Sequence, residues 1–216
     1  MYKITYRPFE PGDFEPVAEL MRTQWSCDMA DEAGVYSSAI DLCGYLAQTD
    51  WSLVAAREDG EVLGAALLRL NDNRSTTWEK RRAALASEVS SDPDLEAEVR
   101  RDVDMLEEEA RLSEEYGASG RLGSKAELKL LIVSPRAQGL GVGGRLFAAA
   151  SEAASKNGGL YLLTDDACDI GFYDHKGMQR MVSRPSEVED PACPQTADAS
   201  DGNAFNLYVY AQGPVR

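Results

Sequence analysis

The sequence has few of the residues that metal sites and disulfide frameworks require. It contains one histidine, His175, and four cysteines at positions 27, 43, 168 and 193, none of them spaced as CxxC. A structural zinc site and a set of disulfides are both poorly supported by this pattern, so we expect reduced thiols and no bound metal.

Positive charge and long apolar runs are also scarce. The 216 residues carry 22 Lys and Arg against 37 Asp and Glu, a formal net charge of −15. This field is of the wrong sign for binding nucleic acid or anionic lipid. No apolar run approaches the ~20 residues of a membrane span, and the first ten residues lack the apolar segment of a signal peptide. We therefore expect a cytoplasmic protein that binds neither nucleic acid nor membrane.

The sequence does contain a globular pattern of strands and helices. Apolar residues make up 44% of the chain, enough for a sizeable core. The length exceeds a typical ~150-residue domain, which favours one domain with an insertion. Hydrophobic periodicity predicts strands at both ends and in the middle of the chain, over 2–9, 51–57, 62–70, 128–133, 160–164, 179–183 and 204–211. It predicts helices after Pro11, over 37–48, over 143–156 and over 168–175.

Residues 71–125 differ from the rest because they are rich in charge. Thr76 and Glu79 form a capping-box pair, and Asp92-Pro93 is typical of a second helix start. An apolar stripe follows at helical spacing, at Leu95, Val99, Val103, Leu106 and Ala110. We interpret 71–125 as a helical insertion within a single domain spanning 1–216, with its charges on a solvated outer face.

A glycine-rich loop joins the predicted strand at 128–133 to the helix that follows. Four glycines, Gly139, Gly141, Gly143 and Gly144, allow positive φ angles and a close approach of the backbone to a ligand. The start of the helix offers free N–H groups and the positive end of its dipole. This combination suits a phosphate or pyrophosphate.

Two nucleotide motifs were compared with this loop. A Walker A loop is excluded, because Gly144 is followed by Arg145 and not by Lys. The dinucleotide fingerprint fits Gly139, Gly141 and Gly144, with Asp165 or Asp166 about 20 residues later. Five residues separate the strand from Gly139, however, and only 50 residues follow Asp166. An NAD(P)-dependent oxidoreductase is therefore an alternative that the spacing disfavours.

The wider context resembles a known family. Glu127-Leu128, Val133-Ser-Pro, the run Arg136-x-Gln138-Gly139-x-Gly141-x-Gly143 and Leu146 are together similar to the acyl-CoA loop of the GNAT N-acetyltransferase superfamily. Gly171–Met178 resembles that family's second signature. The resemblance implies an α/β fold with a mixed, mostly antiparallel central sheet flanked by helices, and a helical insertion between strands 3 and 4. The motifs cover residues 127–178.

The resemblance also implies a cosubstrate, acetyl-CoA, and no metal. In the family, the pyrophosphate lies on the loop amides and the pantetheine arm pairs with the preceding strand. The residues at the loop positions are Gln138, Gly139, Leu140, Gly141, Val142, Gly143 and Gly144, and those on the strand are Leu131, Ile132 and Val133. Asp166 stands where many relatives have an Asn that contacts the cofactor.

Two residues match the family's catalytic positions. Tyr173 matches the tyrosine whose hydroxyl faces the sulfur, and a phenol of pKa ~10 can protonate a departing thiolate. Glu127 matches the general base of the histone-acetylating branch, and a structural, salt-bridged glutamate is the alternative. His175 lies two residues from Tyr173 and should point elsewhere on a helix.

The expected reaction transfers an acetyl group to a primary amine of a small molecule or peptide by direct attack on the thioester. In this fold the acceptor enters between segments that correspond here to 25–36 and 184–203. These segments carry Asp28, Asp31, Glu32, Glu187, Glu189 and Asp190, which favours a cationic amine. A uniformly acidic surface without a role in binding explains the same charges. A non-catalytic CoA-binding regulatory module is a further alternative, and a homodimer is compatible with the sequence.

Overall fold

The computed structural model describes residues 3–27, 29–117, 121–188 and 205–212. Within these residues seven strands form one sheet: β1 (Ile4–Arg7), β2 (Trp51–Arg57), β3 (Val62–Arg69), β4 (Ala126–Val133), β5 (Leu160–Asp165), β6 (Gln179–Pro185) and β7 (Asn206–Ala211). The α-helices are α1 (Phe14–Trp25), α2 (Asp31–Gln48), α3 (Thr76–Val89), α4 (Pro93–Gly117), α5 (Val142–Ala154) and α6 (Ile170–His175). No helix in the described part of the chain combines the length and apolar character needed to cross a bilayer.

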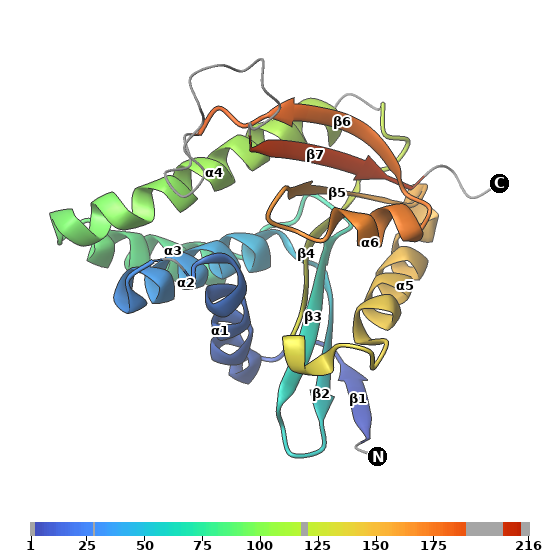
Figure 1. Cartoon of the computed structure of the whole chain (residues 1–216), viewed down its shortest axis with the longest axis horizontal. Coiled ribbons are helices and arrows are strands. Elements are labelled where there is room, and N and C mark those ends of the chain that lie inside the picture. Colours follow the sequence, from blue (N-terminus) through green and yellow to red (C-terminus); the bar gives the residue numbers. More distant parts are fainter. Residues whose placement is uncertain (1–2, 28, 118–120, 189–204, 213–216) are drawn as a thin grey trace.

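The sheet is mixed and mostly antiparallel. Its strand order is β1-β2-β3-β4-β5-β7-β6, and β4 and β5 are the only parallel neighbours among the described strands. In Figure 1 the strands β1 to β4 stand together, while β5 to β7 turn away from them. The predicted fold class, a mostly antiparallel sheet flanked by helices, is confirmed.

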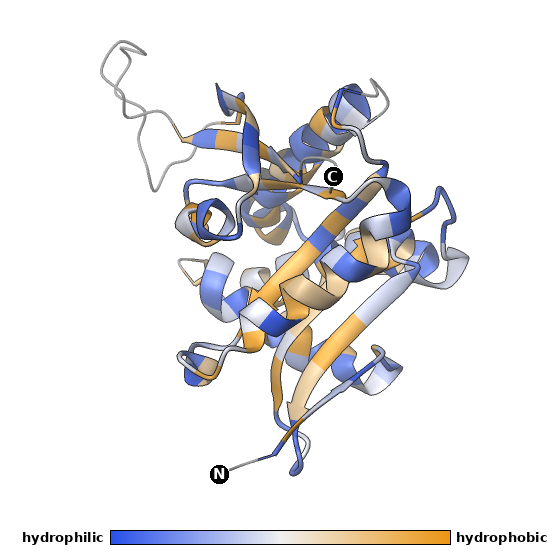
Figure 2. Ribbon diagram, turned by 90° about the vertical axis from the view of Figure 1, so that its right-hand side faces the viewer, coloured by the Kyte–Doolittle hydropathy of each residue, from blue (hydrophilic) through white to orange (hydrophobic). Residues whose placement is uncertain are grey.

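Helices cover both faces of the first half of the sheet. On one face, Leu67 of β3 packs in a core with Phe14 of α1 and Leu42 of α2. On the other face, Leu68 packs in a core with Phe147 of α5. Because both faces are buried, the central strands are nearly continuously apolar and do not alternate, as the colours of Figure 2 show.

Helix α2 begins at Asp31, earlier than the predicted start at residue 37. Asp31 and Glu32 occupy its first turn, where carboxylates interact favourably with the helix dipole. Gly34 lies close to the end of α1, since a Cβ there would be 3.2 Å from the carbonyl oxygen of Ser26. Gly34 therefore allows α2 to pack closely against the end of α1.

Two helices, α3 and α4, lie between β3 and β4, where the sequence predicts helices. Both pack against α2, and α4 then continues to the second half of the sheet (Figure 1). Val99 of the predicted stripe is 1% exposed and packs with Ala33 and Ile40 of α2. That this segment is an insertion within a single acetyltransferase domain stays a prediction.

The second half of α4 contradicts the expectation that its charges are all solvated. Glu108 is fully buried, while Ala110 of the predicted stripe is exposed. The Glu108 carboxylate accepts hydrogen bonds from the Ser186 hydroxyl (2.6 Å) and the Glu187 amide (3.0 Å) after β6. The inward face changes along α4 because the helix leaves α2 and meets a different neighbour.

Strand β4 contains a β-bulge at Lys129. Leu67 pairs with Leu130 and Leu68 with Leu128, so Lys129 is the extra residue on β4. An extra residue reverses the faces to which the following side chains point. Leu128 accordingly packs in the core beneath α5, whereas Leu130 packs in the core beneath α1 and α2.

The two halves of the sheet are joined at their narrow end. Among the described residues, β4 pairs with β5 at Ala126 and Glu127, opposite Leu160 and Tyr161. Beyond this point the two strands diverge, and the sheet opens into a V.

A buried carboxylate lies at the point of divergence. Glu127 is ion-paired with Arg69 of β3 (2.7 Å) and with Lys129 (2.8 Å). Its Oε2 also accepts hydrogen bonds from Ser113 of α4 (2.7 Å) and from the Tyr161 hydroxyl of β5 (3.2 Å). One side chain thus connects three strands to α4.

The surroundings of Glu127 keep it ionised. Burial alone would raise the pKa of Glu127, but the positive charges of Lys129 and Arg69 and the hydrogen bonds from Lys129 and Ser113 outweigh it. The pKa of Glu127 therefore lies below its usual range.

We expect Glu127→Gln to lower the free energy of unfolding by about 3–5 kcal/mol, because it leaves two partly buried cations without this buried counter-ion. Urea unfolding at pH 7 measures the change. The contribution is present above the ordinary carboxyl pKa and is lost as the pH falls through the lowered value.

The matched control for this variant is Glu15→Gln. Glu15 is 78% exposed and pairs with Arg81 at the surface, a contact worth less than about 1 kcal/mol. Equally small losses in both variants would contradict a structural role for the Glu127 cluster.

Candidate active site

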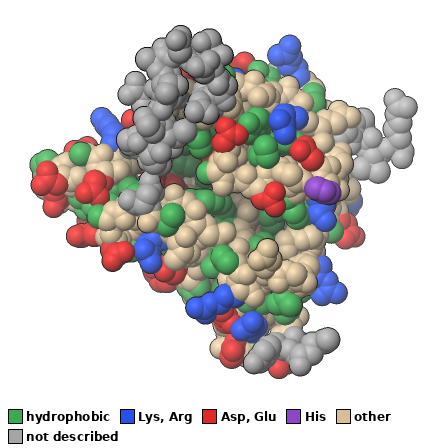
Figure 3. Space-filling model, in the orientation of Figure 1, with side chains coloured by type: hydrophobic (Ala, Val, Ile, Leu, Met, Phe, Trp, Pro, Cys, Tyr) green, Lys and Arg blue, Asp and Glu red, His purple; other side chains and the backbone are tan. Residues whose placement is uncertain are grey.

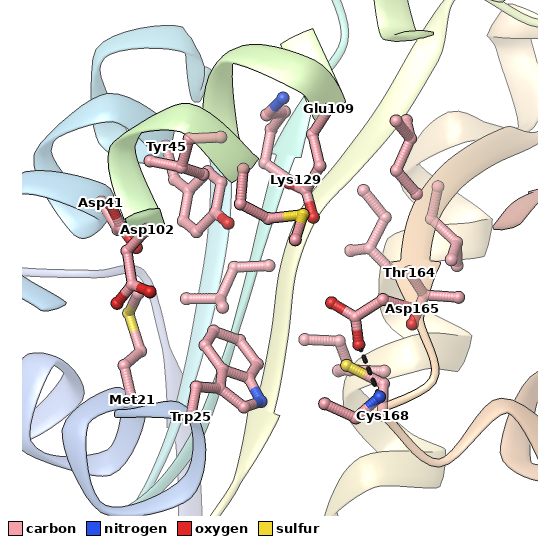
Figure 4. Close-up of a pocket in the computed structure, with 18 of the residues that line it drawn as sticks. Met21, Trp25, Asp41, Tyr45, Asp102, Glu109, Lys129, Thr164, Asp165 and Cys168 are labelled. Carbon is pink, nitrogen blue, oxygen red and sulfur yellow. Dashed lines mark hydrogen bonds between the residues drawn. The ribbon is translucent and has the colours of Figure 1, made fainter. Parts of the chain in front are cut away.

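A cavity of about 180 Å³ opens where β4 and β5 diverge. Residues of β4 and β5 form one side, and α1, α2 and α4 close the other (Figure 4). Its lining carries four carboxylates and one ammonium group: Asp41, Asp102, Glu109, Asp165 and Lys129. The cavity is therefore strongly acidic.

The predicted cofactor strand lies on the open edge of the V. Leu131, Ile132 and Val133 pair with β3 on one side. On their other side β5 has already diverged, since its pairing with β4 is confined to positions 126 and 127. An extended ligand with amide groups can add to such an edge as a strand does.

The glycine loop follows this strand directly. Gly139 (φ +78°) and Gly141 (φ +71°) adopt left-handed conformations that favour glycine, and α5 begins at Val142. Gln138, Gly139 and Leu140 are exposed. The first N–H groups of α5 have no partners within the helix, so they are available to an anion.

Two further glycines bring α5 close to its neighbours. A Cβ at Gly143 would lie 3.3 Å from the Val133 side chain, and one at Gly144 would lie 3.3 Å from the Nζ of Lys176. The Lys176 ammonium group therefore sits beside the first turn of α5, where it adds positive charge. Arg136, by contrast, pairs with Glu61 (3.4 Å).

Tyr173 on α6 lines the cavity at the end near β5. Its ring packs against Phe147, Phe172 and Tyr210, at centroid distances of 5.4–6.3 Å. Burial raises the pKa of the Tyr173 hydroxyl far above its usual value, and the neighbouring Cys168 and Asp165 add to the shift. The hydroxyl therefore stays protonated at neutral pH.

Glu109 reaches the cavity from α4 and lies near Lys129 in Figure 4. Burial raises the pKa of Glu109 to about 8, and the negative charge of Asp165 adds to this while Lys129 opposes it. A carboxylate with this pKa can accept a proton near neutral pH.

The structure places Glu127 and Asp166 outside the cavity lining. Glu127 lies in the ion cluster described above. Asp166 binds β7, since its carboxylate accepts hydrogen bonds from the Asn206 amide (2.8 Å) and the Tyr208 hydroxyl (2.5 Å). The predicted roles of Glu127 and Asp166 stay predictions, but their carboxylate oxygens already bind protein groups.

Three of the acidic residues expected around the acceptor, Asp31, Glu32 and Glu187, lie outside the cavity lining. Asp31 and Glu32 line a separate surface groove between α1, α2 and α3. Glu187 pairs with Arg111 (3.7 Å), and Asp28, Glu189 and Asp190 lie outside the described residues. Figure 3 shows other acidic side chains gathered over the end of the molecule formed by α3 and α4.

The remaining candidate groups are a thiol and an imidazole. Burial raises the pKa of the cavity-lining Cys168 to about 12, so its thiol is protonated and a poor nucleophile. His175 is exposed, and its Nδ1 lies 2.6 Å from the Gly171 carbonyl oxygen. The described residues include no cluster of three or more His, Cys, Asp or Glu placed to hold a metal.

Asp41, Asp102, Glu109 and Lys176 were missed as candidate site residues by the sequence-based interpretation. A signal exists for two of them, because Asp102 and Glu109 flank the stripe residue Leu106 at i−4 and i+3. They therefore share its inward face. Lys176 lies within the second family signature, but the sequence gives no reason to place it beside Gly144.

No family model matches this sequence, and no curated protein matches it significantly. Solved structures do match. The crystal structure of arylalkylamine N-acetyltransferase 2 from Aedes aegypti has a TM-score of 0.55 and 16% identity, covering 96% of this chain and 97% of that chain.

Two more structures agree. The ribosomal-protein-S18-alanine N-acetyltransferase from Escherichia coli has a TM-score of 0.53 and 11% identity, covering 96% of this chain and 92% of that one. A GCN5-related N-acetyltransferase from Kribbella flavida has a TM-score of 0.50 and 15% identity, covering 96% and 95%. At these identities the likeness is one of fold: the chain folds like these N-acetyltransferase structures.

Proposed function

We propose that this protein is an acetyl-CoA-dependent N-acetyltransferase that moves an acetyl group to a primary amine by direct transfer. The observation that carries the proposal is the divergence of β4 and β5. Beyond Glu127 the divergence leaves one edge of β4 without pairing to β5, and the glycine loop lies at the end of that edge. The divergence also opens the acidic cavity, which Tyr173 and Glu109 line.

The residues present fit the proposed cosubstrate. The amides from Gln138 to Gly144, with Lys176 beside them, would hold its pyrophosphate, and the edge of Leu131 to Val133 would pair with its amides. When bound, acetyl-CoA supplies the acetyl group as a thioester. The dinucleotide alternative is not favoured, because that fold requires an open and mostly parallel sheet.

The acceptor amine must lose a proton before it attacks. Glu109 is our candidate base, because it lines the cavity and its raised pKa suits proton acceptance near neutral pH. Glu127 matches the family's base position, but Arg69 and Lys129 hold its carboxylate and lower its pKa. A positioning role for Glu127 fits these contacts better.

The departing thiolate must gain a proton. Tyr173 is our candidate acid, because its raised pKa keeps the hydroxyl protonated and its ring is fixed by neighbouring aromatic rings. The N–C bond forms and the C–S bond breaks. Glu109 takes the ammonium proton before attack, Tyr173 gives its proton to the sulfur, and the proton that the nitrogen loses as the amide forms restores the Tyr173 hydroxyl.

Ligand binding gives the first test. Acetyl-CoA at 100-fold over Kd should stabilise the protein by ~2.7 kcal/mol, whereas NAD(H) should have no effect, as measured by thermal unfolding. Stabilisation by NAD(H) alone would contradict the proposal. Acetyl-CoA binding without transfer to any amine would instead indicate a regulatory module.

The base assignment predicts a pH profile. With native Glu109, kcat/KM for an amine should rise as the pH passes about 8, because the base acts when deprotonated. Glu109→Gln should lower kcat/KM by about 100- to 10,000-fold and leave a rise that follows the pKa of the amine itself.

The control for Glu109→Gln is Glu107→Gln, which removes a carboxylate from an exposed position on the same helix. It should leave the profile unchanged. A wild-type profile that persists in Glu109→Gln would remove Glu109 as the base.

The acid assignment predicts that Tyr173→Phe lowers kcat by about 100-fold or more while the Kd for acetyl-CoA changes little, because the ring packing is retained. Steady-state kinetics and calorimetry measure the two effects. Tyr36→Phe, which removes a hydroxyl that contacts Glu88 at the surface, is the control. An unchanged kcat in Tyr173→Phe across a pH series would show that the acid is another group.

A further inference from the structure

The cavity extends well beyond the groups proposed to act in transfer. At the end away from Asp165 and Cys168, which neighbour Tyr173, Asp41 of α2 and Asp102 of α4 lie side by side (Figure 4). Asp102 accepts a hydrogen bond from Ser37 (2.5 Å), which fixes its carboxylate. Two carboxylates from different helices thus converge in this part of the cavity.

Polar atoms at this end lack partners within the protein. Among the described residues, the Ser38 Oγ and the Asp41 Oδ1 are buried and make no hydrogen bond. Ser38 is 2% exposed and lies one helical turn before Asp41, so both side chains lie on one face of α2. Buried polar atoms without partners are costly, so a ligand that satisfies them would bind favourably.

The charges around Asp41 are mostly negative. Burial raises the pKa of Asp41 well above its usual value, and Asp102 and Glu109 add to this shift. Arg82 opposes it from α3, and the cavity-lining cation Lys129 is already ion-paired with Glu127. An added positive charge would relieve this repulsion.

The cavity also has apolar walls. Trp25, Met105 and Leu106 are among the apolar residues that line the cavity together with the Asp41 carboxylate and Tyr173. They suit an alkyl chain, and the ring of Trp25 can also face a cation.

We propose that the acceptor is a linear aliphatic diamine or polyamine, with one ammonium group held by Asp41, Asp102 and Ser38 while a second amine is acetylated near Tyr173. This inference rests on the proposed function, and it specifies the acceptor class for the same site. Asp41 and Asp102 favour a substrate with a second positive charge, because a monoamine would leave Ser38 and Asp41 without partners.

The test compares α,ω-diaminoalkanes with n-alkylamines of equal chain length, over a series of lengths, using acetyl-CoA and the full chain. The kcat/KM for the best diamine should exceed that of its matched monoamine by about 10- to 100-fold. This factor corresponds to the net contribution of a hydrogen bond to a charged group. Asp41→Asn should bring this ratio down toward one.

Ser38→Ala provides a milder variant that breaks no hydrogen bond within the protein. It should lower the diamine-to-monoamine ratio by about threefold to tenfold. The control is Glu98→Gln, an exposed carboxylate on α4, which should leave the ratio unchanged. In the absence of acetyl-CoA, a diamine should raise the Tm of the wild type by more than it raises the Tm of the Asp41→Asn variant.

The outcomes separate the two proposals. A diamine-to-monoamine ratio near one in the wild type, or a high ratio that Asp41→Asn does not change, overturns this inference and leaves the acetyltransferase assignment standing. Failure to acetylate any amine overturns the acetyltransferase assignment itself, and this inference with it.

Discussion

The fold depends on how one buried carboxylate is neutralised where the sheet divides. Glu127 stands at the last point of contact between β4 and β5, and its partners come from β3, β4, β5 and α4. The two strands are paired at Ala126 and Glu127, and they diverge from Leu128 onward. The ion cluster fixes the apex of the V, so the angle of the cavity walls depends on groups that need not touch a substrate.

Helix α4 converts this opening into a cavity. Its consecutive residues Glu108 and Glu109 face different surroundings: Glu108 binds the backbone after β6, and Glu109 reaches the cavity. The bulge at Lys129 also shapes the site. It reverses the faces to which the side chains of β4 point, so that Leu128 and Leu130 pack in opposite cores. One helix and one extra strand residue therefore shape the acidic side of the site.

Several parts of the structure could be predicted because they are encoded locally. The glycines at 139 and 141 were expected to adopt positive φ, and they do so at the start of α5. Tyr173 was placed in the site by a short motif, and it lines the cavity. Helix α4 followed from Asp92-Pro93 and an apolar stripe, and Asp92 does cap it, although the stripe failed at Ala110. The predicted capping role of Thr76 is wrong, because α3 begins at Thr76 and Ser75 is its N-cap residue.

The sequence by itself determined the strands, the helices and the phosphate-type loop, because each depends on residues within a few positions of one another. Only the tertiary structure decided which carboxylates matter. Asp41, Asp102 and Asp165 are far apart in the sequence and line one cavity because α2, α4 and β5 converge on it. The pKa of Glu109 likewise depends on burial and on charges from other elements, which no local pattern records.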